Sequence, residues 1–294
     1  MIGTSKSRDT ERDRRVAVGM VLGGVASVQL GSALATTLFE ELGPGGAVLL
    51  RTLFAAVVLI AVRRPAIRAI DRDTARQIAS FGVVLALMNL SFYEALERLP
   101  LGIAVTFEFT GPLAVAILAS RSRLDILWAL LAGLGIVLFA PDVGDGLDPV
   151  GIAFALGAAS MWAAYIVIAS QVGRGPAGLG GLSAAMVLAT VVLTPIGVVD
   201  GGTDLFDPSL AAVGVGVALL SSAIPYTLEL EALRRLRAST FGVLLSLEPA
   251  VAALIGAVAL DQELAGREAL AITLVVVASA GALRSATAAE AAGP

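Results

Sequence analysis

The chain has 294 residues, of which 57% are hydrophobic and a further 32 are glycine, whereas 15% are charged and the formal net charge is −4. A soluble domain has roughly 45 to 50% apolar residues with glycine included, so the composition predicts a membrane protein with several bilayer spans. The chain contains no cysteine and no histidine, which excludes disulfides, thiolate chemistry and the commonest metal ligand.

The chain begins with a tail of mixed charge, residues 1–15. The apolar stretch that follows is too long for the core of a signal peptide, which predicts a retained first span. A helix needs about 20 residues to cross the bilayer, and ten segments qualify, so we expect an all-α membrane protein with a short C-terminal tail, residues 285–294. The predicted spans are 16–38, 45–62, 75–96, 101–120, 124–140, 150–172, 179–199, 210–231, 238–260 and 267–284.

The distribution of positive charge predicts the orientation of these spans. If the N-terminus is cytoplasmic, all of the 20 lysines and arginines except Arg51, Arg98 and Arg267 lie on the cytoplasmic side. Acidic residues such as Glu40 and Asp204 gather in the opposite connections. Cytoplasmic loops of membrane proteins carry an excess of lysine and arginine, so both termini are expected to be cytoplasmic.

The chain also contains an internal repeat. EALERL at Glu94–Leu99 matches EALRRL at Glu231–Leu236, an offset of 137 that also places Pro112 on Pro249, and GVAS at residues 24–27 matches GAAS at residues 157–160. The pattern predicts two halves, 16–140 and 150–284. Because each half has five spans, an odd number, the halves face opposite ways across the membrane. Inverted repeats are typical of transporters that expose one central site to each side in turn.

The repeated segments resemble a known family. MNLSFYEALERLPLGIAVTFEFTGPLAVAILASRSRLD (residues 88–125) and IPYTLELEALRRLRASTFGVLLSLEPAVAALIG (residues 224–256) are similar to the bacterial threonine and homoserine exporters, in the EamA-domain branch of the drug/metabolite transporter superfamily. SVQLGSALATTLF (residues 27–39) and ALGAASMWAAYIV (residues 155–167) look like the openings of that family's two halves. The resemblance implies ten helices in two inverted EamA repeats, a bacterial inner-membrane location, and efflux of amino acids or similar metabolites.

Two glutamates lie inside apolar spans. Glu108 stands seven residues after Leu101, about 10 Å into the bilayer at a rise of 1.5 Å per residue, and Glu248 lies near the middle of the ninth span. An ionised side chain at this depth costs roughly 2.5 to 3.5 kcal/mol, so each acid should face a cavity, meet a partner or bind a proton. We expect one to bind a substrate ammonium group and at least one to exchange a proton. The alternative is a neutral acid that joins neighbouring helices.

Three prolines interrupt predicted spans, namely Pro112, Pro225 and Pro249. Each removes one helical hydrogen bond and frees a carbonyl group. Broken helices often frame the midplane site of a transporter, although a kink that serves packing alone explains each proline equally well. Glu229 and Glu231 are interpreted as structural acids that Arg234 and Arg235 neutralise at helical spacing.

Other polar groups lie in the same spans as the two acids. For each one, hydrogen bonding between helices or anchoring at the interface competes with substrate contact. Arg51 could bind a substrate carboxylate through two N–H groups, but snorkelling of its side chain to the outer surface is the favoured interpretation. The remaining candidates for the substrate or proton site are Gln29, Asn89, Tyr93, Trp162, Tyr165, Tyr226 and Ser246.

A secondary transporter accounts for these features best. The chain has no GxxxxGK[ST] phosphate loop, so an ion gradient must supply the energy, and protons are expected because the carboxyls are buried. An intramembrane enzyme is disfavoured because the spans lack serine–lysine, serine–histidine and aspartyl pairs, and a passive channel because no filter-like loop or charge ring is present. A broader drug or metabolite exporter is the main alternative. The expected partners are a small-molecule substrate, protons and the lipid bilayer. No cofactor, metal ion or nucleic acid is expected, and the sequence predicts no oligomeric state.

Overall fold

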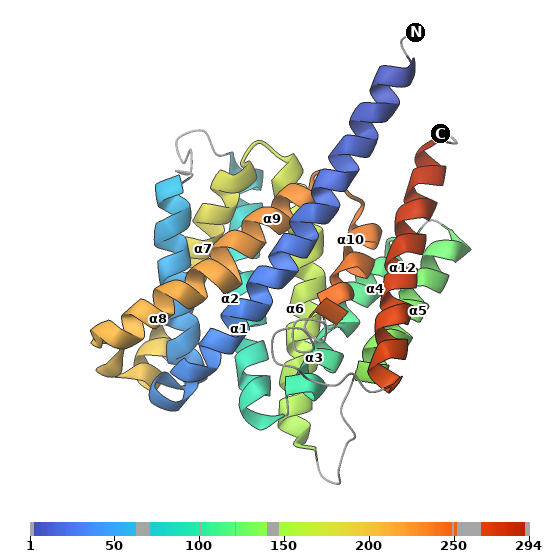
Figure 1. The fold of residues 1–294 in the computed structure, drawn as a ribbon. Helices are drawn as coiled ribbons and strands as arrows, with labels where there is room; N and C mark the ends of the chain where they lie inside the picture. The colour runs from blue at the N-terminus through green and yellow to red at the C-terminus, as the bar shows by residue number, and fades with distance from the viewer. Residues whose placement is uncertain are drawn as a thin grey trace.

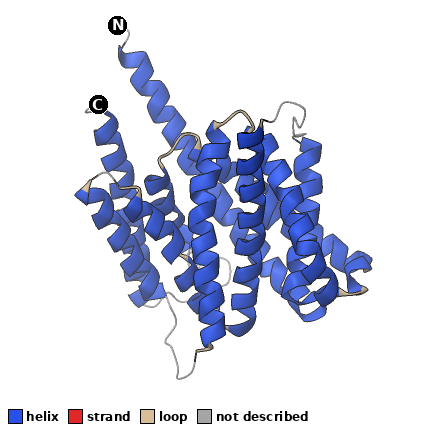
Figure 2. Cartoon of the chain, turned by 180° about the vertical axis from the view of Figure 1, so that it is seen from behind, coloured by secondary structure: helices blue, strands red, loops and turns tan. Residues whose placement is uncertain are grey.

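The protein is built from helices joined by short connections (Figure 1). The computed structural model describes residues 3–62, 71–99, 101–120, 122–139, 147–248, 250–251 and 266–291. Seen from behind, these residues form helices and loops and no strand (Figure 2). The prediction of an all-α protein is therefore confirmed for the part of the chain that the structure describes.

The first two predicted spans belong to α1 (Gly3–Val62), which is interrupted at Gly43. Gly43 has φ 62° and ψ 174°, a conformation open to glycine because it lacks a Cβ atom, and the chain turns back there (Figure 1). Pro44 follows. The carboxylate of Asp200 accepts a hydrogen bond of 3.1 Å from the Gly45 amide, at the positive end of the returning helix. A glycine, a proline and a distant acid together make the turn.

The next helices have local start signals. Asp71 caps α2 (Arg72–Arg98) by accepting from the Thr74 amide, and Asp148 caps α6 (Pro149–Arg174) by accepting from the Val150 amide. In both cases a side-chain oxygen satisfies an amide that has no partner inside the helix. These helices, together with α7 (Gly178–Gly201), contain the third, sixth and seventh predicted spans.

The fourth and ninth predicted spans are each interrupted within the described residues. The fourth forms α3 (Leu101–Glu108) and α4 (Thr110–Leu118), separated at Phe109 with φ −64° and ψ −13°. The ninth begins with α10 (Ala238–Leu245), which ends at Ser246 with φ −63° and ψ −11°. Phe109 and Ser246 are 137 positions apart, the offset of the sequence repeat. Pro112 lies three residues after the first break and lacks the amide that would bond to the Glu108 carbonyl. Pro249 lies outside the described residues.

The eighth predicted span changes its helical type midway. A short 3₁₀ turn, η2 (Asp204–Phe206), precedes α8 (Pro208–Ala218), which continues through a π-helical turn, η3 (Leu219–Ala223), into α9 (Ile224–Leu233). The amide of Ile224 bonds to the Leu219 carbonyl, five residues back. Such π turns are rare overall, and those that occur are often found at functional sites. Here the turn ends two residues before Pro225.

Within the described residues, five helical segments are long and apolar enough to cross a membrane, and two shorter apolar helices accompany them. The long segments are Thr37–Val62, Arg72–Arg98, Pro149–Arg174, Gly178–Gly201 and Pro208–Leu233, and the shorter ones are Ile103–Leu118 and Ala269–Ser285. The last of these belongs to α12 (Gly266–Ala291), which packs on α5 (Arg123–Phe139). Both predicted tails are partly helical, because α1 begins at Gly3 and α12 ends at Ala291.

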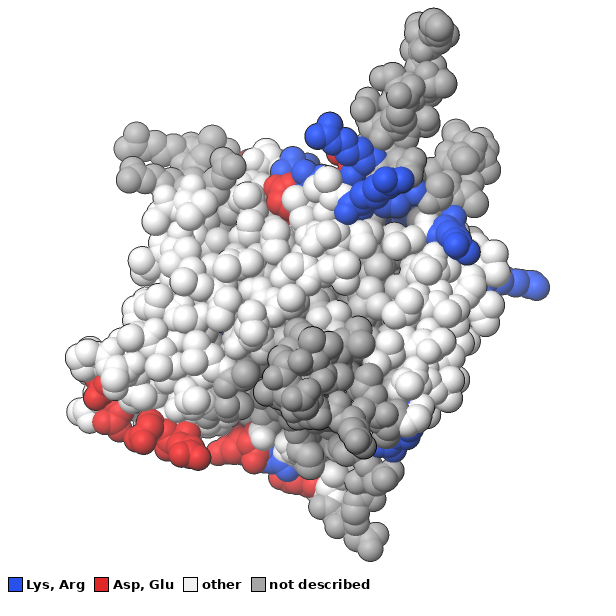
Figure 3. All heavy atoms as spheres, viewed as in Figure 1, with Lys and Arg blue, Asp and Glu red and all other residues white. Residues whose placement is uncertain are grey.

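The packing separates an interior from an apolar outer surface. The largest buried cluster joins α1, α2, α6, α7 and α9 around Phe81, Tyr165 and Met186. Large apolar side chains such as Leu118 and Val191 are exposed on the outside, where a bilayer would cover them. On the face that Figure 3 shows, most of the basic atoms lie at the end from which the N-terminal helix projects and most of the acidic atoms lie along the opposite end, and the described atoms between them are uncharged. The charges are thus divided between two ends, as a spanning protein requires.

Candidate functional site

Arg51 lies inside the protein and has partners on three helices. Its Nε donates to the Ser222 hydroxyl at 2.7 Å, and Nη1 donates to the Tyr93 hydroxyl at 3.2 Å. Its Nη2 donates to the Ser221 carbonyl at 2.5 Å and to the Tyr226 hydroxyl at 3.3 Å. Arg51 is only 8% exposed. The interpretation that it snorkels to the outer surface is therefore wrong, because four interior acceptors hold the guanidinium.

One acceptor for this arginine, the Ser221 carbonyl, is free because Pro225 has no amide hydrogen. In a regular helix the Ser221 carbonyl would accept from the amide of residue 225, but proline has no amide hydrogen. The π turn also sends the Ile224 amide to Leu219, which leaves the Leu220 carbonyl without a helical donor. Arg51 bonds to the first freed carbonyl, and the Ser27 hydroxyl bonds to the second at 2.6 Å. Two side chains of α1 thus occupy the carbonyl groups at the π turn and Pro225.

Asn89 and Tyr226 extend this polar cluster across the interior. The Tyr226 hydroxyl donates to Asn89 Oδ1 at 3.1 Å, and Asn89 Nδ2 donates to the Leu85 carbonyl at 2.7 Å. Both residues are buried. The guanidinium of Arg51 also lies 5.6 Å from the centroid of the Tyr93 ring, within the range of a cation–π interaction. Four predicted candidates, Arg51, Asn89, Tyr93 and Tyr226, therefore form one hydrogen-bonded cluster.

The two predicted acids lie beside this cluster at the two helix breaks. Glu108 is the last residue of α3, and Glu248 follows the break at Ser246 by two positions. Both are half-buried, and Gln29 Nε2 donates to Glu248 Oε1 at 3.3 Å. Glu108 is close enough to Glu248 and Arg51 for their charges to interact. The structure thus brings two acids and one cation, from separate parts of the sequence, into one electrostatically connected group.

Glu229 is a third interior acid, although its sequence position predicts neutralisation by Arg234 and Arg235. Its carboxylate accepts a hydrogen bond of 2.8 Å from the Tyr165 hydroxyl, and the residue is 6% exposed. Glu231 forms the expected ion pairs, at 2.8 Å with Arg234 and 2.9 Å with Arg235. The interpretation of Glu229 as neutralised by these arginines is therefore wrong.

Helical spacing explains the difference between these two acids. Arg234 and Arg235 lie three and four residues after Glu231, on the same helix face, but five and six residues after Glu229. Glu229 instead lies three residues after Tyr226, which turns it towards the same interior face. This spacing was available in the sequence and identifies Glu229 as an interior residue.

The remaining candidates have different surroundings. Trp162 is half-buried and packs edge-on against Phe109 with centroids 5.0 Å apart, which places it at the break between α3 and α4. The Ser246 hydroxyl donates to the Val243 carbonyl of its own helix. This bond occupies the hydroxyl hydrogen, so that Ser246 lies beside the acids with its donor engaged.

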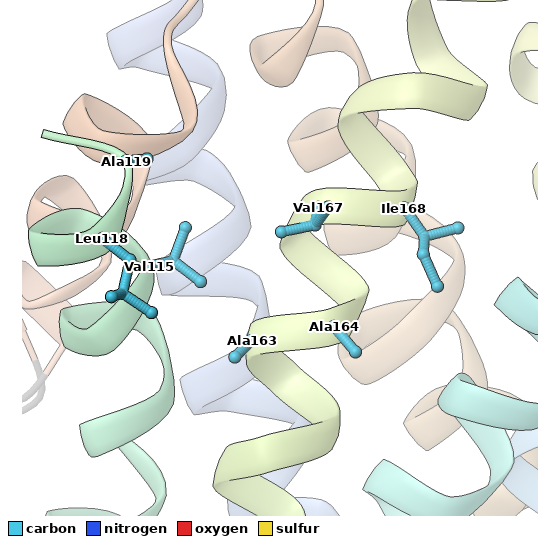
Figure 4. A pocket seen from close by; sticks show the side chains of 7 residues that line it. All are labelled: Val115, Leu118, Ala119, Ala163, Ala164, Val167 and Ile168. Atoms are coloured by element: carbon cyan, nitrogen blue, oxygen red, sulfur yellow. The ribbon is translucent and has the colours of Figure 1, made fainter.

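An apolar groove lies apart from the polar cluster, between α4 and α6. Its volume is 530 Å³, and Figure 4 shows Val115 pointing towards α6 and Val167 pointing towards α4. The described residues that line it are all apolar, and Leu118 at its rim is 85% exposed. The lining residues are Val115, Leu118, Ala119, Ala163, Ala164, Val167 and Ile168.

Comparison with known proteins identifies the family. Residues 149–284 match the EamA-like transporter family. Threonine/homoserine exporter RhtA from Salmonella typhimurium strain LT2 is 39% identical over 266 residues, which cover 89% of this chain and 89% of that protein. The exporter of the same name from Escherichia coli strain K12 is 39% identical over 267 residues with the same coverage. This chain belongs to the EamA-like transporter family.

The EamA assignment confirms the resemblance seen in the repeated segments, and it agrees with the apolar helices described above. This EamA-family chain is a multi-pass membrane protein. A solved crystal structure superposes on it with a TM-score of 0.74 over 93% of this chain and 98% of that one. The two sequences are 21% identical, so the likeness between them is one of fold alone.

Proposed function

We propose that this chain exports threonine, homoserine or related small metabolites across the bacterial inner membrane. The observation that carries the proposal is the identity of 39% with threonine/homoserine exporters over 89% of both chains. The match extends over most of the length of both proteins and is not confined to one half of the chain.

The proposed architecture is ten spanning helices in two inverted five-helix repeats, residues 16–140 and 150–284, with both tails cytoplasmic. Three features support it. The helix breaks at Phe109 and Ser246 have nearly equal backbone angles at an offset of 137. At the same offset, Arg98 Nη1 donates to the Glu94 carbonyl and Arg235 Nη1 to the Glu231 carbonyl, both at 2.7 Å. The exposed charges are also divided between two ends (Figure 3).

In the proposed mechanism, the two repeats rock against each other and expose the interior site to each side in turn. Glu108 and Glu248, with Gln29, form the site for the substrate ammonium group, because they are half-buried acids beside the helix breaks. A zwitterion also presents a carboxylate, and Arg51 is a cation whose charge interacts with Glu108. Four of the five N–H groups of Arg51 are engaged, so its contribution to the carboxylate is chiefly its charge.

The proposed energy source is proton antiport. One elementary charge moved across 100 mV corresponds to about 2.3 kcal/mol, enough to drive efflux against a gradient of more than tenfold. Buried carboxyls supply groups that can bind the proton inside the bilayer.

The first experiment measures export in cells. Deletion of the gene should sensitise the host to added threonine or homoserine, and overexpression should confer resistance. Lipophilic cations serve as the comparison, because resistance to them in place of the amino acids would indicate the broader exporter. A double variant, Glu108→Gln with Glu248→Gln, is the inactive control.

The second experiment measures coupling in vesicles. Purified protein is reconstituted with labelled threonine inside, and efflux is followed with and without a pH gradient. A proton-coupled carrier should show faster threonine efflux when a pH gradient drives protons inward. It should also lose label faster when unlabelled threonine is added outside. An efflux rate that is the same with and without the gradient contradicts proton coupling. An efflux rate that external substrate does not increase indicates a channel.

A further inference from the structure

Glu229 has the environment of a proton-binding residue. It lies on α9, four residues before the helix ends at Leu233, and is 6% exposed. Its carboxylate accepts a hydrogen bond of 2.8 Å from the Tyr165 hydroxyl of α6. On the other side α1 approaches closely, since a Cβ atom at Gly24 would lie 3.9 Å from the Glu229 Cγ. The carboxyl group is thus enclosed by three helices and accepts one side-chain hydrogen bond.

The charges around Glu229 leave it without an adjacent cation. Arg51 on α1 interacts with it electrostatically, but the guanidinium is bonded to Ser222, Tyr93, Tyr226 and the Ser221 carbonyl. Arg234 and Arg235 pair with Glu231 instead. An ionised carboxylate in this position is therefore countered by a neutral phenol and by a cation that other groups hold.

Among the described residues, the neighbouring helices carry their further cations towards their ends, and on α1 Arg12, Arg14 and Arg15 precede Gly24 by at least nine residues. Besides Tyr165, α6 carries Arg174, whose Nη2 donates to the Leu236 carbonyl. Neither η3 nor α10 contains a titratable residue, and the titratable residue of α7 is Asp200, at its far end. The segment after α10 supplies Glu248, an acid whose charge interacts with Glu229. A proton can therefore neutralise the buried Glu229 carboxylate reversibly.

The position of Tyr165 connects Glu229 to the polar cluster. The rings of Tyr165 and Tyr226 lie 5.5 Å apart, and the Tyr226 hydroxyl bonds to both Asn89 and Arg51. A change in charge at Glu229 therefore acts on the residues at which the two halves of the chain meet. Coupled transport requires such a link between the ion site and the element that moves.

We propose that Glu229 binds and releases the transported proton and that Tyr165 is its positioning residue, leaving Glu108 and Glu248 to the substrate. This inference rests on the proposed function and names the site of its coupling ion. In the step, the Glu229 carboxylate takes up one proton to form the neutral acid and later releases that proton to the opposite side. No covalent bond of the substrate changes.

The chain offers a matched pair of acids for the test. Glu229→Gln removes the interior carboxyl, and Glu231→Gln removes the ion-paired carboxyl two residues away on the same helix. Each variant is reconstituted in vesicles and assayed for threonine counterflow at equal pH on both sides, and for efflux driven by a pH gradient. Glu231→Gln should match the unaltered protein in both assays. Glu229→Gln should keep counterflow and lose both the response to the gradient and the proton movement that accompanies efflux.

Two further variants keep the test decisive if Glu229→Gln fails to reach the membrane. Glu229→Asp retains a carboxyl, and Tyr165→Phe removes the hydrogen-bond donor, so each should keep coupled efflux with a shifted pH dependence. Unchanged pH profiles in both variants, or full gradient-driven efflux by Glu229→Gln, would overturn the proposal. If the unaltered chain shows no gradient-driven efflux, proton antiport itself fails, and that outcome is distinct from failure of Glu229 as the proton site.

Discussion

The hydroxyl of Tyr226 donates a hydrogen bond of 3.1 Å to Oδ1 of Asn89, and these residues are 137 positions apart. The same offset relates EALERL to EALRRL and the helix break at Phe109 to that at Ser246. In the proposed repeats, Asn89 and Tyr226 are therefore equivalent positions. Equivalent positions of two copies can contact each other only near the axis that relates them, so this bond marks the centre of the proposed pseudo-symmetry.

The bond between these residues should contribute to stability. Tyr226→Phe keeps the ring beside Tyr165 but leaves Asn89 Oδ1 without its donor, and a buried unsatisfied group costs about 1 to 3 kcal/mol. We expect a lower midpoint of thermal unfolding for the protein in detergent. Asn89→Leu completes a double-mutant cycle. The double variant should lose less stability than the two single variants lose together. Fully additive losses would show that the bond contributes nothing.

Arg51 and Pro225 should be energetically coupled. Arg51→Met leaves the Ser221 carbonyl unpaired, at about 1 to 3 kcal/mol per orphaned group, and should destabilise the protein strongly. Pro225→Ala supplies an amide that can bond to that carbonyl. Arg51→Met should therefore be less destabilising in the Pro225→Ala background, as measured by thermal unfolding of the four proteins. Equal losses in both backgrounds would contradict the account of the freed carbonyl.

The contact between α4 and α6 depends on Gly111. A Cβ atom there would overlap the carbonyl oxygen of Ala159, which is backbone and cannot rotate away. Gly111→Ala should destabilise the protein by about 1 to 3 kcal/mol through overpacking. The control is Gly157→Ala on α6, where the nearest atom to a Cβ is the Ser91 Oγ at 3.7 Å, an ordinary contact. Thermal unfolding should separate the two variants, and similar midpoints would argue against this packing.

The two acids at the helix breaks should differ from Glu231 in their effect on substrate binding. Glu248→Gln keeps an acceptor for Gln29 Nε2 and removes the charge, so it isolates the electrostatic contribution. We expect Glu108→Gln and Glu248→Gln each to weaken threonine binding to the purified protein by at least about tenfold, which corresponds to about 1.4 kcal/mol. Glu231→Gln should leave binding unchanged. Wild-type affinity in both interior variants would remove these acids from the substrate site.

The stability of the N-terminus of α8, which Asp207 caps, should depend on pH. Hydrogen bonds from the Ser209 hydroxyl and from the Leu210 and Ser209 amides lower the pKa of Asp207. Because the pKa is lowered in the folded state, this stabilisation is full above the ordinary aspartate value of about 3.9 and is lost as the pH falls through the lowered pKa.

Asp207→Ala should accelerate amide hydrogen exchange at Ser209 and Leu210 at pH 7, and the difference from the unaltered protein should vanish once Asp207 is protonated. Asp207→Asn should retain the cap without the pH dependence. Asp204→Ala serves as the nearby acidic control. A difference in exchange that persists unchanged at acid pH would contradict the cap.

Much of the fold follows from local sequence rules. The apolar runs predicted helices where α2, α5, α6, α7 and α12 occur, since a helix satisfies its own backbone groups. Aspartates before Arg72, Pro149 and Pro208 set helix starts, and Pro225 predicted a freed carbonyl. Spacing alone pairs Glu231 with Arg234 and Arg235. Each of these features depends on residues within about five positions of one another, which is the reach of helical geometry.

The partners of the interior polar residues were decided by the tertiary structure. Arg51 and Ser222 are separated by 171 positions, and Gln29 and Glu248 by 219. One arginine near a span end is compatible with both snorkelling and burial, because either satisfies its charge. Helix packing settled the choice by bringing the π turn and its freed carbonyls against α1. The sequence by itself determined that the apolar runs form helices, because backbone hydrogen bonding is local, whereas the packing of distant helices decided which acid meets which donor.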